Sequence, residues 1–401
     1  MNEERSQKVA ALTEGDVAAL HQHYREKGFV QLQSGPLQEE LKELRDLLQS
    51  AMQLEHATIP PYLTGLYSMK AEMPWNIIGI IRTIVVEEML HLLLAANVLN
   101  AIGGQPNLTA PDFIPDYPSY LPHHIDDLIV NLEPFSPQFV QQGLAIERPK
   151  YVDPVRIVLG DPERMTIGEF YVLIESKLRS VVAQYGEAAV FTGDLKRQVQ
   201  PDMFYYDGAG QPVPVINLET AVKALQIITD QGEGMERTIW VGGDDSDNEV
   251  AHYFRFNELA VGRQYQSGDT YQSGPTGAVL SVPYDLAYSA AVNAKIAEYP
   301  AGSEVRTHAE AFNMAYGQLL QLLERAFTGE PSLLLQSVPH MYLLRNAAQA
   351  LFKNPFPAKE DSGLNAAPTF EYVPVLTGQV ASGATLTASG GVHPGHPLKQ
   401  A

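Results

Sequence analysis

The sequence has no cysteine among its 401 residues. Disulfide bonds, thiolate metal sites and a cysteine nucleophile are therefore excluded, and any metal must be bound by oxygen and imidazole ligands. Basic residues are also few, because 27 Lys and Arg stand against 47 Asp and Glu, a formal net charge of −20. Nucleic acids and anionic membranes attract basic surfaces, so we expect neither as a partner.

Long apolar runs are missing as well. No stretch reaches the roughly 20 apolar residues that a membrane-spanning helix needs. The N-terminal segment MNEERSQKVAALTEGD is charged and lacks the apolar stretch and small-residue cleavage site of a secretory signal. We therefore expect a soluble, cytoplasmic protein.

Apolar residues recur at spacings of three and four along several segments, which is typical of helices packed on a core. Segments 37–69 and 77–102 are joined by a short link and should form an antiparallel hairpin. Residues 105–165 are rich in proline and tyrosine, and we interpret them as a long crossover with a short helix started by Ser136-Pro137. Further helices are expected at 167–182, about 217–231, about 246–264, 305–327 and 333–353.

These patterns divide the chain into four parts. Residues 1–36 form an N-terminal arm, and residues 37–265 form a helical bundle with a crossover and an insertion. Residues 266–356 supply additional helices packed on the bundle. Residues 357–401 are rich in Gly, Ser, Thr, Ala and Pro, so we expect a disordered tail.

Charged residues lie on the apolar faces of the predicted helices, where an unpaired charge is costly. Glu55 lies on the first face, and Glu88 and His91 lie on the second. The spacing Glu-x-x-His lets one helix give a carboxylate and an imidazole to one metal pair, and it occurs again at Glu249 and His252. Two such helices, with one glutamate from each of two others, form the ligand set of di-iron and di-manganese carboxylate bundles.

The glutamate expected from segment 167–182 is Glu175, at the edge of the apolar face. Glu169 is a second choice, because capping with Thr166 already explains it. Glu233 in QGEG is another second choice, since it ends a helix and could fold inward. The predicted metal ligands are Glu55, Glu88, His91, Glu175, Glu249 and His252.

Four neighbouring residues have simpler interpretations. Glu87 faces outward or supports a ligand, and His56 is off the apolar face that carries Glu55. Tyr62 and Tyr171 are interpreted as core residues rather than as redox-active groups.

Five motifs carry a family resemblance: LEHATIPPYL around Glu55, EEMLH around Glu88, IGEFY, QGEG, and HYFRF around His252. They resemble the ferritin-like domain associated with iminophenyl-pyruvate dimer synthases of bisindole pigment biosynthesis, over about residues 37–355. The resemblance implies an all-α, ferritin-like four-helix bundle with a long crossover and additional C-terminal helices. It also implies a metal site that uses Glu55, Glu88, His91, a glutamate of segment 167–182 and His252.

Members of that family couple oxidised aromatic amino-acid units. The leading hypothesis is therefore an oxidase or oxygenase that uses two metal ions and dioxygen as co-substrate. Iron is the expected metal. Its substrate would be a small, amino-acid-derived metabolite. The sequence is compatible with a homo-oligomer. The alternative is a ferritin-like protein for iron storage or detoxification. A mononuclear iron site at His124 and Asp126 is a third interpretation, which the long helical patterns disfavour.

Overall fold

The computed structural model describes residues 36–122, 128–149, 166–205, 210–232, 238–241 and 249–374. The predicted arm, apart from its last residue, lies outside these ranges. So do Glu233, His124 and Asp126.

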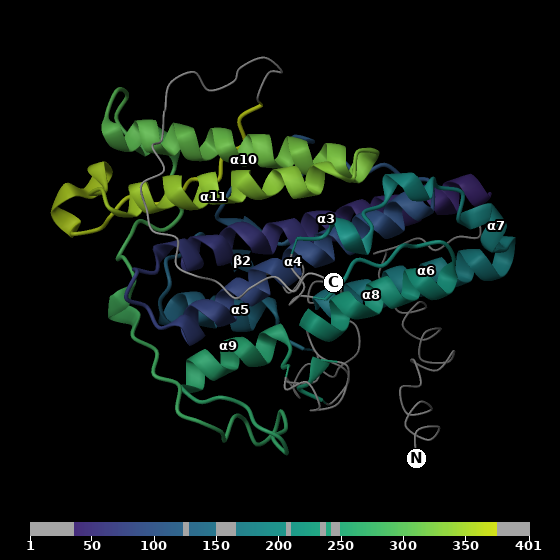
Figure 1. Cartoon of the computed structure of the whole chain (residues 1–401), viewed down its shortest axis with the longest axis horizontal. Coiled ribbons are helices and arrows are strands. Elements are labelled where there is room, and N and C mark those ends of the chain that lie inside the picture. The colour runs from purple at the N-terminus through teal and green to yellow at the C-terminus, as the bar shows by residue number, and fades with distance from the viewer. Residues whose placement is uncertain are drawn as a thin grey trace, which may run out of the picture.

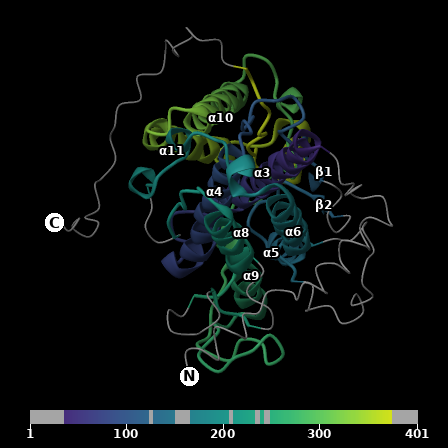
Figure 2. The same cartoon turned by 90° about the vertical axis from the view of Figure 1, so that its right-hand side faces the viewer.

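Four helices form the bundle that the sequence predicts. They are α3 (Leu37–Ser68), α4 (Trp75–Ala101), α6 (Ile167–Tyr185) and α8 (Leu218–Gly232). Helix α3 packs on α4 and α6, while α8 packs on α4 and α6, so the four close a ring (Figure 2). The prediction of an all-α four-helix bundle is confirmed.

The fourth helix of this ring differs from the expected one. Of the segment expected as a helix over about 246–264, the structure describes residues 249–264, and within these only α9 (His252–Val261) is helical. The ring is completed by α8 instead. Within the described residues before α9, Val250 lies in a bridge with Trp240, and the Ala251 amide donates to the Ile239 carbonyl at 3.1 Å. These backbone bonds hold the residues before His252 in an extended conformation.

Helix α5 (Pro137–Ile146) lies in the crossover, where a short helix is expected. The Ser136 hydroxyl caps it by accepting from the Phe139 amide at 3.1 Å, and proline fits the first turn because it needs no hydrogen-bond donor there. Two glycines allow its close packing. A Cβ atom at Gly65 would lie 2.3 Å from the Phe139 ring, and one at Gly143 would lie 2.4 Å from the Phe256 ring on α9.

Helix α3 contains Pro60 and Pro61, which lack the amide protons that would bond to the carbonyls of His56 and Ala57. The Tyr117 hydroxyl donates to the Ala57 carbonyl at 2.7 Å. A residue of the crossover thus satisfies a carbonyl that the second proline leaves free, and it binds the crossover to α3 just after Glu55.

A second pair of helices covers the other side of α3 and α4. Helices α10 (Glu304–Thr328) and α11 (Leu333–Phe352) agree with the two helices expected there, and they pack on α4 and α3 respectively. Figure 1 shows this pair running along α3 and α4, on the side opposite α6 and α8. The described helices therefore lie in layers, with α3 and α4 in the middle.

Residues 357–374 of the tail predicted to be disordered are described by the structure, and they are ordered. Phe370 is buried, and its ring packs against Phe312 at 4.8 Å and Tyr316 at 5.3 Å between centroids. The Thr369 hydroxyl donates to the Asn313 side chain at 2.9 Å. The polar composition of residues 357–401 predicts disorder because composition does not show that the single ring of Phe370 packs against α10.

The remaining described elements are short. They are β1 (Ser119–Tyr120) paired antiparallel with β2 (Ile129–Val130), α7 (Glu187–Val190), and the 3-10 helices Leu195–Arg197, Pro201–Met203, Tyr284–Leu286, Ile296–Glu298 and Pro357–Ser362. No helix in the described part of the chain is both long enough and apolar enough to cross a membrane.

Candidate metal centre

Two clusters of carboxylate and imidazole side chains meet inside the bundle and share one glutamate. The first consists of Glu55 from α3 with Glu88 and His91 from α4. The second consists of Glu88, Glu147 at the C-terminal end of α5, and His252 at the start of α9. All five side chains are buried.

One oxygen of Glu88 faces both imidazoles. Its Oε1 lies 2.8 Å from Nδ1 of His252 and 3.7 Å from Nδ1 of His91. Nδ1 of His91 is also 3.3 Å from Oε2 of Glu55, and Nδ1 of His252 is 3.6 Å from Oε2 of Glu147. Glu88 therefore has the position of a bridging carboxylate, with one further carboxylate and one imidazole on each side.

The second oxygen of each carboxylate is close to a hydroxyl group. These pairs are Tyr171 Oη with Glu55 Oε1 at 2.5 Å, Tyr62 Oη with Glu147 Oε1 at 2.5 Å, and Thr58 Oγ1 with Glu88 Oε2 at 2.7 Å. Burial raises the pKa of both tyrosines well above the usual range, so they stay protonated and donate. Each hydroxyl leaves the other carboxylate oxygen turned toward the imidazoles.

The outer nitrogen of each imidazole also has a partner. Nε2 of His252 lies 2.8 Å from Oε2 of Glu87, and Nε2 of His91 lies 3.0 Å from Oε1 of Gln231. The Arg255 guanidinium lies 3.1 Å from Glu87 and holds that carboxylate in place. Hydrogen bonds from Nε2 to these oxygens would leave the Nδ1 lone pairs free to bind a metal.

The cluster concentrates negative charge in a buried site. Burial raises the pKa of Glu88 to about 7, and the carboxylate of Glu147 adds to the shift. Burial would lower the pKa of His252, but the close carboxylates of Glu147 and Glu87 outweigh it and raise the pKa well above its usual value. In the described ion pairs, Glu55, Glu88 and Glu147 have imidazole partners only.

A pair of divalent cations fits these donors. Nδ1 of His252 is buried and has no aligned hydrogen-bond partner among the described residues, although Glu88 Oε1 is only 2.8 Å away. Buried polar atoms are rarely left unsatisfied. Three carboxylates and two imidazoles form an oxygen and nitrogen donor set that suits iron, manganese or zinc.

Four of the predicted ligands meet in these clusters: Glu55, Glu88, His91 and His252. Glu175 does not join them, contrary to the prediction. It lies at the outer edge of α6, where its carboxylate pairs with Arg179 at 2.7 Å. Its place at the boundary of the apolar face left both directions open, and the arginine one turn later favours the outward one.

Glu249 also lies apart from the clusters, because the helix begins only at His252. Its carboxylate pairs with Arg255 at 2.8 Å and is partly exposed. The second Glu-x-x-His motif is therefore not a helical pair. Glu169 caps α6 in a capping box with Thr166, as its simpler interpretation has it.

The sequence does not predict Glu147 as a ligand, because it lies in segment 105–165, which lacks a long periodic helix. A signal was present, since Phe139, Gly143 and Glu147 follow at intervals of four and share one face of α5. Glu87, for which a supporting role was one of two interpretations, is buried against His252. His56 is outside both clusters.

The four-helix bundle and its inward carboxylates and histidines are the features of ferritin-like proteins. A family model described as Ferritin-like matches residues 48–261, which is more than half of the 401 residues. The chain belongs to the ferritin-like family, and the resemblance inferred from the motifs is confirmed.

One curated protein and one solved structure are similar to this chain. Dichlorochromopyrrolate synthase from Lentzea aerocolonigenes is 25% identical over 277 residues, which cover 64% of this chain and 25% of that protein. The chain thus spans about a quarter of that relative's length. The crystal structure of a ferritin-like protein from Caulobacter vibrioides matches with a TM-score of 0.55 and 22% identity, over 82% of this chain and 97% of the other. That likeness shows the fold.

Proposed function

We propose that the protein is a dimetal oxidase or oxygenase that uses two iron ions and dioxygen. The observation that carries the proposal is the shared oxygen of Glu88, which lies 2.8 Å and 3.7 Å from the Nδ1 atoms of His252 and His91. A carboxylate in this position can hold two cations close together. When bound, iron would supply the one-electron chemistry that reaction with dioxygen requires.

The chain's own residues would position and neutralise the metal pair. Glu55 and His91 would hold one ion, Glu147 and His252 the other, and Glu88 both. Tyr171 and Tyr62 would fix the terminal carboxylates through their hydroxyl protons. The pair formed by Glu87 and Arg255 would keep His252 in the orientation that offers Nδ1.

A small, amino-acid-derived metabolite is the proposed substrate class. The support is the biosynthetic relative, dichlorochromopyrrolate synthase, which is named for making a small organic product. The layer formed by α10 and α11, together with the long crossover, adds structure around the bundle in which a substrate site can be built.

Iron storage is the second candidate, because a ferritin-like bundle that binds iron through carboxylates and histidines is compatible with it. Loading with ferrous iron without oxygen, followed by exposure to air, separates the two. An enzyme should retain about two irons per chain and then stop, whereas a storage protein should mineralise many irons and elute as a very large assembly.

Mineral formation would contradict the enzymatic proposal while leaving the metal centre intact. A native centre filled with zinc, which has no redox chemistry, would contradict the oxidase proposal in the same way. Protein purified from its own host without added metal is the sample for this measurement.

A further inference from the structure

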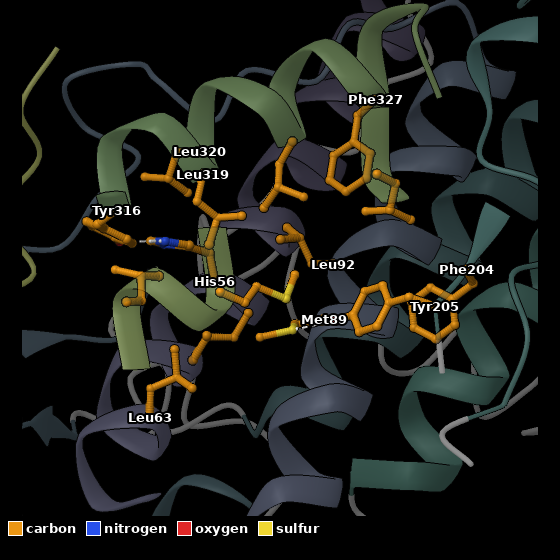
Figure 3. A pocket seen from close by; sticks show the side chains of 15 residues that line it. His56, Leu63, Met89, Leu92, Phe204, Tyr205, Tyr316, Leu319, Leu320 and Phe327 are labelled. Carbon is orange, nitrogen blue, oxygen red and sulfur yellow. Dashed lines mark hydrogen bonds between the residues drawn. The ribbon is translucent and has the colours of Figure 1, made fainter. Parts of the chain in front are cut away.

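A small cavity lies between the middle layer of helices and the α10–α11 pair, and its volume is about 40 Å³. Figure 3 shows its walls, in which His56 and Met89 face Tyr316, Leu320 and other residues of α10. The metal ligands lie on the opposite sides of α3 and α4, since Tyr171 of α6 contacts Glu55. The cavity and the metal centre are thus separated by one layer of helices.

Every ligand of the first cluster has a chain neighbour in the cavity wall. The three pairs are Glu55 with His56, Glu88 with Met89, and His91 with Leu92. Successive residues of a helix point about 100° apart. The same turns of α3 and α4 therefore present metal ligands on one side and line the cavity on the other.

The polar atoms of the wall are largely used. The Tyr316 hydroxyl lies 2.8 Å from Nε2 of His56, and the Tyr205 hydroxyl donates to the Met89 sulfur at 2.8 Å. Nδ1 of His56 has no partner among the described residues. A buried water needs two to four polar partners, so this wall favours an apolar occupant.

The size of the cavity limits that occupant. Engineered apolar cavities of about 150 Å³ hold benzene or xenon, and this one is several-fold smaller. It admits a diatomic gas or a noble-gas atom and excludes an aromatic metabolite. We propose that this cavity binds dioxygen beside the metal centre. The use of the gas rests on the proposed function, but its binding does not.

Xenon, an apolar atom that scatters X-rays strongly, is the probe. Crystals of the full metal-free chain, pressurised with xenon, should show an anomalous peak between α4 and α10, enclosed by Leu92 and Leu320. Absence of a peak would overturn the proposal, and so would an ordered water bonded to Nδ1 of His56 in its place. This test needs no variant and no activity.

A filled cavity tests the link to the reaction. Leu320→Phe should abolish the xenon peak and raise the KM for dioxygen several-fold, with metal content and kcat unchanged. The matched control Leu320→Met nearly conserves volume and should keep both the peak and the KM. If a folded Leu320→Phe variant has lost the xenon peak but keeps the wild-type KM for dioxygen, the cavity does not deliver dioxygen to the reaction.

The two proposals fail separately. Xenon binding in a protein that consumes no dioxygen would remove the oxidase proposal and leave the gas site. Dioxygen consumption without xenon binding would do the reverse.

Discussion

Glu147 belongs to the second cluster and not to the first, and Glu147→Gln removes its charge with little change of shape. The wild type should bind about two divalent ions per chain and the variant about one, because the first cluster keeps all its ligands. Loss of a group that only orients a ligand weakens metal binding by about 10- to 100-fold. Loss of the ligand itself should cost at least that, or about 1.4–2.7 kcal/mol.

In the metal-free protein, Glu147 makes two opposed contacts. Its carboxylate repels that of Glu88 and helps to raise the pKa of Glu88, but it also attracts the imidazole of His252 and raises the pKa of that ring. Glu147→Gln removes both effects, so the difference between variant and wild type should appear mainly when metal is added. Metal present at about 100 times its Kd adds about 2.7 kcal/mol per site, so the wild type should gain more from metal than the variant does.

Anaerobic loading with ferrous or manganous ions, desalting and elemental analysis measure the stoichiometry, and thermal unfolding with and without metal measures the stabilisation. Glu175→Gln is the matched control, since it makes the same change on a carboxylate that pairs with Arg179. The reasoning is refuted if Glu147→Gln retains two ions at wild-type affinity, or if Glu175→Gln loses one.

Metal binding and stability can be tested at four other positions. Glu88→Ala should lose both ions by elemental analysis, because its carboxylate faces both clusters. Tyr171→Phe should weaken only the first cluster, by about 10- to 100-fold in a metal titration. Gly143→Ala should cost about 1–3 kcal/mol in chemical denaturation, because its Cβ would meet a ring of α9, while Gly79→Ala, with open space, should be neutral or stabilising. Burial raises the pKa of Glu258 from 4.5 to about 7. Its contribution to stability is therefore full below a pH of 4.5 and is lost as the pH rises through 7. Glu258→Gln should flatten the pH dependence of unfolding across that window.

The part of the site that the sequence predicts is the part carried by long, regular helices. Glu55, Glu88 and His91 lie on apolar faces that continue for many turns, so periodicity alone fixes the side on which each lies. The same reasoning places α10 and α11.

The missed part depends on contacts between segments that are distant in the sequence. Glu147 follows a helix of only ten residues, and its inward position depends on the packing of α5 against α9. The extended conformation of Glu249 depends on backbone bonds between 239–241 and 249–251. Backbone bonds between distant segments do not produce a periodic pattern of apolar residues. The sequence therefore predicts that the helix extends to the residues before His252.

The origin of the ligands suggests that the two halves of the centre differ in rigidity. The first cluster uses α3 and α4, whose central turns are enclosed by helices on both sides. The second takes Glu147 and His252 from helix ends that lie outside the ring, and the glycine at 143 lets these two helices approach. Any change that loosens α5 from α9 should therefore release the second ion while the first stays bound. For this reason, Gly143→Ala should lower metal content toward one ion per chain, a result that general destabilisation of the bundle would not produce.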